Sequence, residues 1–172
     1  GGGGPGIYSQ LGNGDGTFSA PVRYGNAGSA PLYPANTVVS TDLNRDGITD
    51  LVLDEDGAIS VLAGRRDGTF GPPSPLVTVN EGGPGLLISD FNGDGVQDLA
   101  IPAAPVRGAY PYGAAIYPGL GDGSFGQPVQ YAFNSSDTQF TVSDFNGDGR
   151  PDIVFGNSGS NIYVQLGTTA EN

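Results

Sequence analysis

The chain has 172 residues, a formal net charge of −12 at pH 7, and no histidine, cysteine, lysine, methionine or tryptophan. Without histidine, cysteine and lysine it cannot build a Ser-His-Asp triad, a thiol nucleophile, an ordinary zinc site or a Schiff base, so we expect no enzymatic activity. Nucleic acid is an unfavourable partner because acidic surfaces repel the phosphate backbone, and no apolar run is long enough to insert into a membrane.

The 31 glycines and 14 prolines divide the chain into many short segments. This composition is typical of an all-β fold with short strands and tight turns. Residues 1–6 (GGGGPG) are expected to be a flexible lead-in, and residues 168–172 a tail. The absence of methionine indicates a processed chain or a fragment of a longer one.

A first repeated segment appears as IYSQLGNGDGTF at residues 7–18. It recurs as ISVLAGRRDGTF at 59–70 and AIYPGLGDGSF at 115–125, and a shortened copy, NIYVQLG, occupies 161–167. Each copy predicts a short strand, a tight turn, and a phenylalanine that begins the next strand. The DGT and DGS triplets supply turn residues that tolerate positive φ, as a hairpin requires.

A second, acidic segment of nine residues occurs at 42–50 (DLNRDGITD), 90–98 (DFNGDGVQD) and 144–152 (DFNGDGRPD). Each copy has oxygen-bearing side chains at positions 1, 3, 5 and 9, glycine at position 6, and an apolar run after it. So many carboxylates repel one another unless a cation lies among them. A hard cation with six to eight oxygen ligands fits best, and Ca²⁺ is the natural candidate.

The spacing of the copies predicts a β-propeller. The acidic segments start 48 and 54 residues apart, and about four strands in roughly 50 residues make one propeller blade. The expected divisions of residues 7–167 are a partial blade at 7–35, blades at 36–83 and 84–137, and a partial blade at 138–167. About three blades are fewer than the ~4–8 of a closed ring, so we expect part of a larger propeller or a homo-oligomer.

One unit is longer than the others. The last aspartate of the acidic segment precedes the hairpin glycine by 14 and 15 residues in two units but by 21 in the middle one. The extra residues fall within 102–115, where Arg107, Tyr110 and Tyr112 are candidates for binding a sugar or a protein. An ordinary surface loop is the alternative interpretation.

These two alternating motifs, D-x-[DN]-x-D-G-x-x-D before an apolar strand and G-x-G-D-G-[TS]-F, resemble the FG-GAP/VCBS repeats of integrin α chains and bacterial secreted proteins. The resemblance implies a β-propeller with about three structural Ca²⁺ ions, each in a hairpin loop between the first two strands of a blade. Carried over by position, the ligands would be side chains at positions 1, 3, 5 and 9 and the carbonyl at position 7: Asp42, Asn44, Asp46, Ile48 and Asp50; Asp90, Asn92, Asp94, Val96 and Asp98; and Asp144, Asn146, Asp148, Arg150 and Asp152.

Two other calcium motifs share the start of these segments. EF-hands and dockerin repeats need an acidic residue at position 12 and flanking helices, whereas position 12 here is Leu53, Ile101 or Phe155 within β-like runs. RTX nonapeptides repeat in tandem, which these copies do not. The FG-GAP/VCBS interpretation is therefore the better fit.

Several further residues have ordinary explanations. Asp54, Glu55 and Asp56 could form a carboxylate dyad with Glu81 for glycoside hydrolysis, but a polar turn is the simpler interpretation. Asn134 begins an N-glycosylation sequon. We expect six apolar side chains to pack between blades, namely Leu43, Phe91, Phe145, Phe18, Phe70 and Phe125.

The predicted function is that of a calcium-stabilised extracellular module, secreted or at the cell surface and bacterial in origin, for protein interaction, adhesion or scaffolding. A carbohydrate-binding propeller and an accessory propeller of a larger secreted enzyme are the alternatives. Its partner would be a protein or a glycan.

Overall fold

The computed structural model describes residues 7–24, 37–55, 58–78, 85–103, 113–132, 139–156 and 162–167. These residues form thirteen β-strands and contain no helix. The strands make four antiparallel sheets, which we number as blades. The first blade has strands β1 (Ile7–Ser9) and β2 (Val22–Tyr24). The second blade has strands β3 (Thr37–Thr41), β4 (Asp50–Glu55), β5 (Ala58–Leu62) and β6 (Ser74–Thr78). The third blade has β7 (Leu87–Ser89), β8 (Asp98–Ala103), β9 (Gly113–Tyr117) and β10 (Val129–Ala132), and the fourth has β11 (Gln139–Ser143), β12 (Asp152–Gly156) and β13 (Ile162–Gln165).

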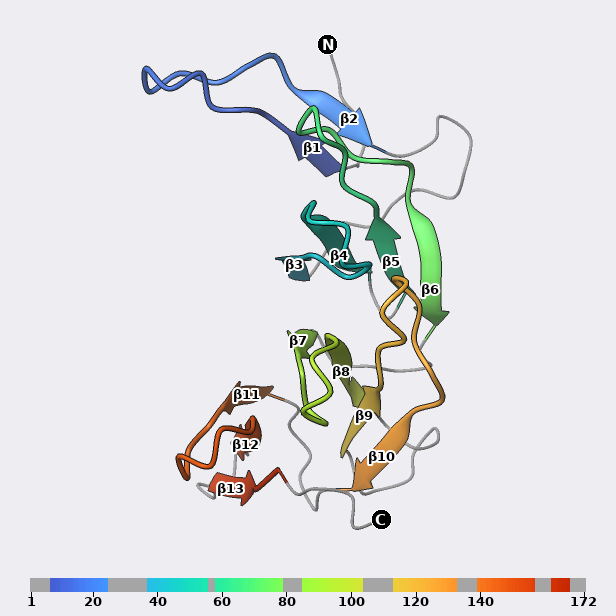
Figure 1. Ribbon diagram of the computed structural model, residues 1–172, viewed down its shortest axis with the longest axis vertical. Coiled ribbons are helices and arrows are strands. Elements are labelled where there is room, and N and C mark those ends of the chain that lie inside the picture. The colour runs from blue at the N-terminus through green and yellow to red at the C-terminus, as the bar shows by residue number, and fades with distance from the viewer. Residues whose placement is uncertain are drawn as a thin grey trace.

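The blades follow one another in a curved row and do not close into a ring (Figure 1). Each sheet pairs its strands in chain order, as an up-and-down blade does. Strand β7 contacts both β3 and β11, so the first strands of three successive blades lie side by side. The all-β fold of four-stranded propeller blades predicted from the repeats is therefore confirmed, whereas the two incomplete blades lie at opposite ends of the row and do not complete each other.

Neighbouring blades cover both faces of the second blade, and strand β4 presents an apolar side chain to each of them. Val52 belongs to the core shared with the third blade, and Leu53 to the core shared with the first. Both side chains are fully buried. A strand that is buried on both faces needs a continuous apolar run rather than alternation, which explains the LVL run after the acidic segment.

Packing between blades relies on the phenylalanines of two hairpins, Phe70 and Phe125. Phe70 meets Tyr24 of the first blade edge to face, with ring centroids 5.6 Å apart, and Phe125 packs against the core of the second and third blades. Each hairpin phenylalanine forms an isolated bridge with a glycine, and the outer strand starts four residues later, so the prediction that phenylalanine begins the strand is wrong.

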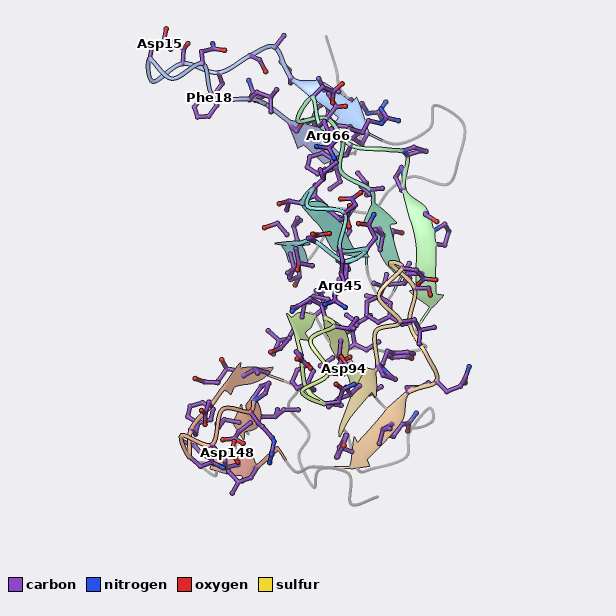
Figure 2. The ribbon with its side chains drawn as sticks, viewed as in Figure 1. Asp15, Phe18, Arg45, Arg66, Asp94 and Asp148 are labelled. Carbon is purple, nitrogen blue, oxygen red and sulfur yellow. The ribbon has the colours of Figure 1, made fainter. Side chains whose placement is uncertain are left out.

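Two of the six apolar side chains expected in the core are exposed. Phe18 and Phe145 are 65% and 52% exposed, whereas Leu43 is buried and Phe70, Phe91 and Phe125 are half-buried. The two phenylalanines differ in their neighbours. Phe70 packs against the first blade, whereas Phe18 lies on a hairpin that projects away from the other blades (Figure 2). The described residues form no helix, so they contain no helix that is long and apolar enough to cross a membrane.

Candidate metal-binding loops

Each acidic segment forms the hairpin loop between the first two strands of a blade. The closing strand pairs are Thr41 with Asp50, Ser89 with Asp98, and Ser143 with Asp152. Strands therefore flank every loop, which excludes the helix-flanked EF-hand and dockerin alternatives. Glycine at position 6 has φ between 81° and 85° in all three copies, a backbone region that only glycine adopts at little cost.

The aspartate at position 1 organises the loop through its two oxygens. Asp90 Oδ1 accepts the N–H groups of Gly93 and Asp94, and its Oδ2 accepts the N–H of Gly95. Asp144 makes the same three bonds, and these N–H donors, that of Gly149 foremost, lower the pKa of Asp144. The negative charge is thus held where backbone dipoles converge.

The side chains at positions 3 and 5 of each loop are joined by hydrogen bonds. In the second loop the amide of Asn92 donates to Asp94 Oδ2 at 2.9 Å, and its oxygen accepts the Asp94 N–H at 2.8 Å. Asp94 Oδ1 accepts the N–H of Val96 at 2.7 Å. The other loops repeat this pattern through Asn44 and Asp46 and through Asn146 and Asp148.

The aspartate at position 9 is buried and ties two segments of its blade together. Asp98 is 1% exposed, its Oδ2 accepts the N–H of Phe91 at 2.9 Å, and its Oδ1 accepts the N–H of Gly119 at 2.8 Å. Asp50 bonds Leu43 and Gly64, and Asp152 bonds Phe145 and Gly167, in the same way. Burial raises the pKa of Asp98, with a contribution from the charge of Asp94, while the two N–H donors oppose the rise.

The glycine that meets this aspartate is a functional residue that the sequence analysis did not single out. A Cβ on Gly64 or Gly119 would lie 2.1 or 2.2 Å from the carbonyl oxygen of Thr49 or Gln97, the residue before the position-9 aspartate. A side chain therefore cannot fit there. The signal was present in the sequence, because a glycine stands six residues before the phenylalanine of each hairpin, at Gly12, Gly64 and Gly119.

The donor set fits a hard cation in its chemistry. Positions 1, 3 and 5 of each loop offer only carboxylate and amide oxygens beside the carbonyl of position 7. Within the described ranges, however, no three acidic side chains converge closely enough to form a ready-made metal centre. Both oxygens of the aspartates at positions 1, 5 and 9 already accept hydrogen bonds within the blade, as in Asp90, Asp94 and Asp98. The ligand roles of all five positions stay predictions.

A second set of aspartates shapes the hairpin turns. Asp67 Oδ1 accepts both the hydroxyl and the N–H of Thr69, at 2.7 and 2.9 Å, and Asp15 does the same with Thr17. The hydroxyl bond is the main reason that the pKa of each aspartate lies below its ordinary value. Each of these aspartates accepts from the threonine two positions later, whereas the position-1 aspartate of an acidic loop accepts N–H groups from several residues.

A groove of about 330 Å³ runs between the third and fourth blades. Ile116, Val129 and Tyr131 line it from the third blade, and Ile153 and Leu166 from the fourth. The groove is largely apolar and lies between two blades, beside the second acidic loop. Asn92 of the second loop reaches its rim.

Several predicted site residues lie outside the described part of the chain. They are Arg107, Tyr110 and Tyr112, the acidic residues Asp56 and Glu81, and the sequon at Asn134. Asp54 is described and lies in strand β4, buried and accepting the N–H of Gly85 at 3.2 Å. It is therefore a strand residue, and the prediction that it belongs to a polar turn is wrong.

Comparison with known families shows to which family this chain belongs. The FG-GAP-like repeat family matches residues 42–101 and 106–155. The chain belongs to this family. Its two matched segments begin at the first acidic loop and run across the second and third loops, so the repeats recognised from the sequence are those of the FG-GAP-like family.

A solved structure supports the fold of this FG-GAP-like chain. One chain of the Tc holotoxin pore of Photorhabdus luminescens is 17% identical, with a TM-score of 0.56 over 94% of the present chain. The present chain spans only 8% of that toxin chain. A search of curated proteins finds no match.

Proposed function

We propose that this FG-GAP-like chain is a calcium-stabilised, extracellular β-propeller module whose role is to bind or scaffold other proteins. The observation that carries the proposal is the threefold recurrence of one loop. In each copy position 1 accepts the N–H of the position-6 glycine, position 3 accepts the N–H of position 5, and position 5 accepts the N–H of position 7. Position 9 accepts the N–H of position 2 in every copy as well. Nine of the 18 acidic residues lie in these loops. A divalent cation in each would remove half of the formal charge of −12.

In this proposal the side chains at positions 1, 3, 5 and 9 and the carbonyl at position 7 hold Ca²⁺. Neutralising three exposed carboxylate clusters stabilises the hairpins, so that the free energy of cation binding adds to the free energy of folding. Loops of this kind can be filled at the calcium concentrations outside cells even when the affinity is weak, which supports an extracellular location.

The protein-binding role is supported by one bare blade face. Ile162 and Val164 alternate along β13 of the fourth blade and are 75% and 54% exposed. Their counterparts in the second blade, Ile59 and Val61, pack against the third blade. An apolar face whose equivalent is covered elsewhere in the molecule is suited to another blade, from a longer chain or from a second copy.

A glycan ligand is the second candidate because of the groove between the third and fourth blades. Tyr131 and Asn92 line it, and an aromatic ring beside an amide is a common way to hold a sugar. Selective binding on a glycan array that is lost in Tyr131→Ala would favour this role. Silence across the array would leave the protein-binding proposal in place.

Thermal unfolding in excess Ca²⁺ and in EGTA tests the calcium proposal. Asp94→Ala should lose part of the calcium-dependent rise in Tm, while Asp122→Ala, which removes the same charge from a hairpin turn of the same blade, should keep it. An unchanged rise in Asp94→Ala would refute the assignment of the second loop. No calcium response in the unaltered protein would refute the proposal as a whole.

A further inference from the structure

The first acidic loop differs from the others at position 4. Arg45 stands there with φ 61°, whereas Gly93 and Gly147 have φ 78° and 77°. Arg45 is the one residue other than glycine with positive φ in the described ranges. A side chain in this region is strained, and such strain persists where the surroundings hold the residue in place.

The side chain of Arg45 reaches across to the third blade. Its Cδ lies 3.8 Å from the position of a Cβ on Gly121, in the hairpin turn of that blade. Its Nη2 lies 3.8 Å from the position of a Cβ on Gly95, in the second acidic loop. Figure 2 shows Arg45 between the second blade and the loop that carries Asp94.

The neighbouring side chain reinforces this contact. The Cβ of Asn44 lies 3.6 Å from the position of a Cβ on Gly123, in the same hairpin turn. The first acidic loop therefore lies in van der Waals range of the second acidic loop and of the hairpin turn of the third blade. Arg45 delivers a guanidinium, which is charged at every accessible pH, to the edge of the second loop.

The second loop has three aspartates and no basic residue of its own. A guanidinium beside it attracts the empty loop and repels a divalent cation that enters the loop. This effect acts between blades, because the guanidinium belongs to the first acidic loop, in the second blade, and the divalent cation would enter the second acidic loop, in the third blade. No such residue stands at position 4 of the second or third loop, where glycine takes its place.

We propose that Arg45 is a positioning residue that holds the second acidic loop against the second blade and weakens the affinity of that loop for divalent cations. The proposal rests on the proposed calcium function. Cation occupancy of the second loop then opposes the contact between the second and third blades. The occupancy of one loop and the fit of two blades are thereby coupled through a single side chain.

A site-resolved calcium titration tests this role. The amide signals of Gly47, Gly95 and Gly149 report the three loops separately by NMR. Arg45→Met keeps the length of the apolar stem and removes the charge, and it should tighten calcium binding at Gly95 by about threefold to tenfold at low ionic strength. Arg45→Lys should retain most of the wild-type affinity, and the gain in Arg45→Met should shrink at about 0.5 M salt.

The matched control is Arg23→Met, which removes the same charge from β2 in the first blade, far from the second loop (Figure 1). It should leave the affinity at Gly95 unchanged, and neither variant should alter the affinity at Gly149. Equal affinity at Gly95 in Arg45→Met and the unaltered protein would overturn the inference while leaving the calcium proposal intact.

A measurement without calcium separates the two proposals. In EGTA, Arg45→Met should shift the amides of Gly95 and Gly121, and Arg23→Met should not. If no loop of the unaltered protein binds calcium, the proposed function fails and the affinity role of Arg45 fails with it. If the amides of Gly95 and Gly121 also stay in place in EGTA, the contact between blades is refuted as well.

Discussion

The carboxylate of Asp98 accepts the N–H of Gly119 at 2.8 Å across 21 residues of sequence. The equivalent pairs, Asp50 with Gly64 and Asp152 with Gly167, have the same distance across 14 and 15 residues. The additional residues of the third blade lie between β8 and β9 and leave the contact unchanged. The bond between the acidic loop and the end of the third strand is therefore a fixed part of the blade.

Asp98→Ala should lower the free energy of unfolding by about 2–4 kcal/mol, because it leaves the N–H groups of Phe91 and Gly119 without their buried acceptor. Since this loss comes from the blade itself, it should appear in EGTA as well as in calcium. Urea denaturation measures it, with Asp94→Ala as the comparison. A loss that appears only in calcium would show that Asp98 acts through the cation alone.

Gly119→Ala should destabilise the protein by about 3 kcal/mol or more, because a Cβ there would lie 2.2 Å from the carbonyl oxygen of Gln97. Gly12 is the matched control: it forms the same bridge in the first hairpin, and a Cβ on it meets nothing within 4 Å. Gly12→Ala should therefore change stability by less than about 0.5 kcal/mol. Similar Tm values for the two variants would contradict the close approach.

The fold could be predicted from the sequence because its two motifs repeat. The acidic segment identifies the hairpin between the first two strands, and the D-G-[TS]-F segment identifies the turn after the third strand, so two local patterns determine a blade. What could not be predicted is which of several identical motifs has a neighbour. Phe18 and Phe70 occupy the same place in their segments, yet only Phe70 has a blade against it.

The roles within the acidic loop were also only partly predictable. Composition indicates that Asp90 and Asp98 both serve as oxygen donors, but Asp90 is half-buried and Asp98 is fully buried. That difference arises from the register of β7 and β8 and from the return of the chain to Gly119. The reach of Arg45 across two blades has no signal in a local pattern.

Thr69→Val should raise the pKa of Asp67 toward its ordinary value, because it removes the hydroxyl bond that is the largest cause of the lowering. In the unaltered protein the lowered pKa means that Asp67 stabilises the fold above the pKa of the unfolded chain, and that this contribution is lost as the pH falls through the folded pKa. An NMR titration of the aspartate carboxyl groups measures the shift. The pKa of Asp122, which Ser124 lowers in the third blade, should not move and serves as the internal control.

Phe70→Ala should lower the free energy of unfolding by about 2 kcal/mol, because Phe70 is half-buried and packs edge to face on Tyr24. Phe18→Ala should cost less than about 0.5 kcal/mol in a monomer, since Phe18 is 65% exposed. If the first blade associates with other copies through its exposed hairpin, Phe18→Ala should also reduce the mass measured by light scattering. Leu120→Ala is the control, because Leu120 is 62% exposed in the hairpin of the third blade, and it should leave the mass unchanged. A compact monomer with equal mass in both variants would show that the hairpin of the first blade takes no part in assembly.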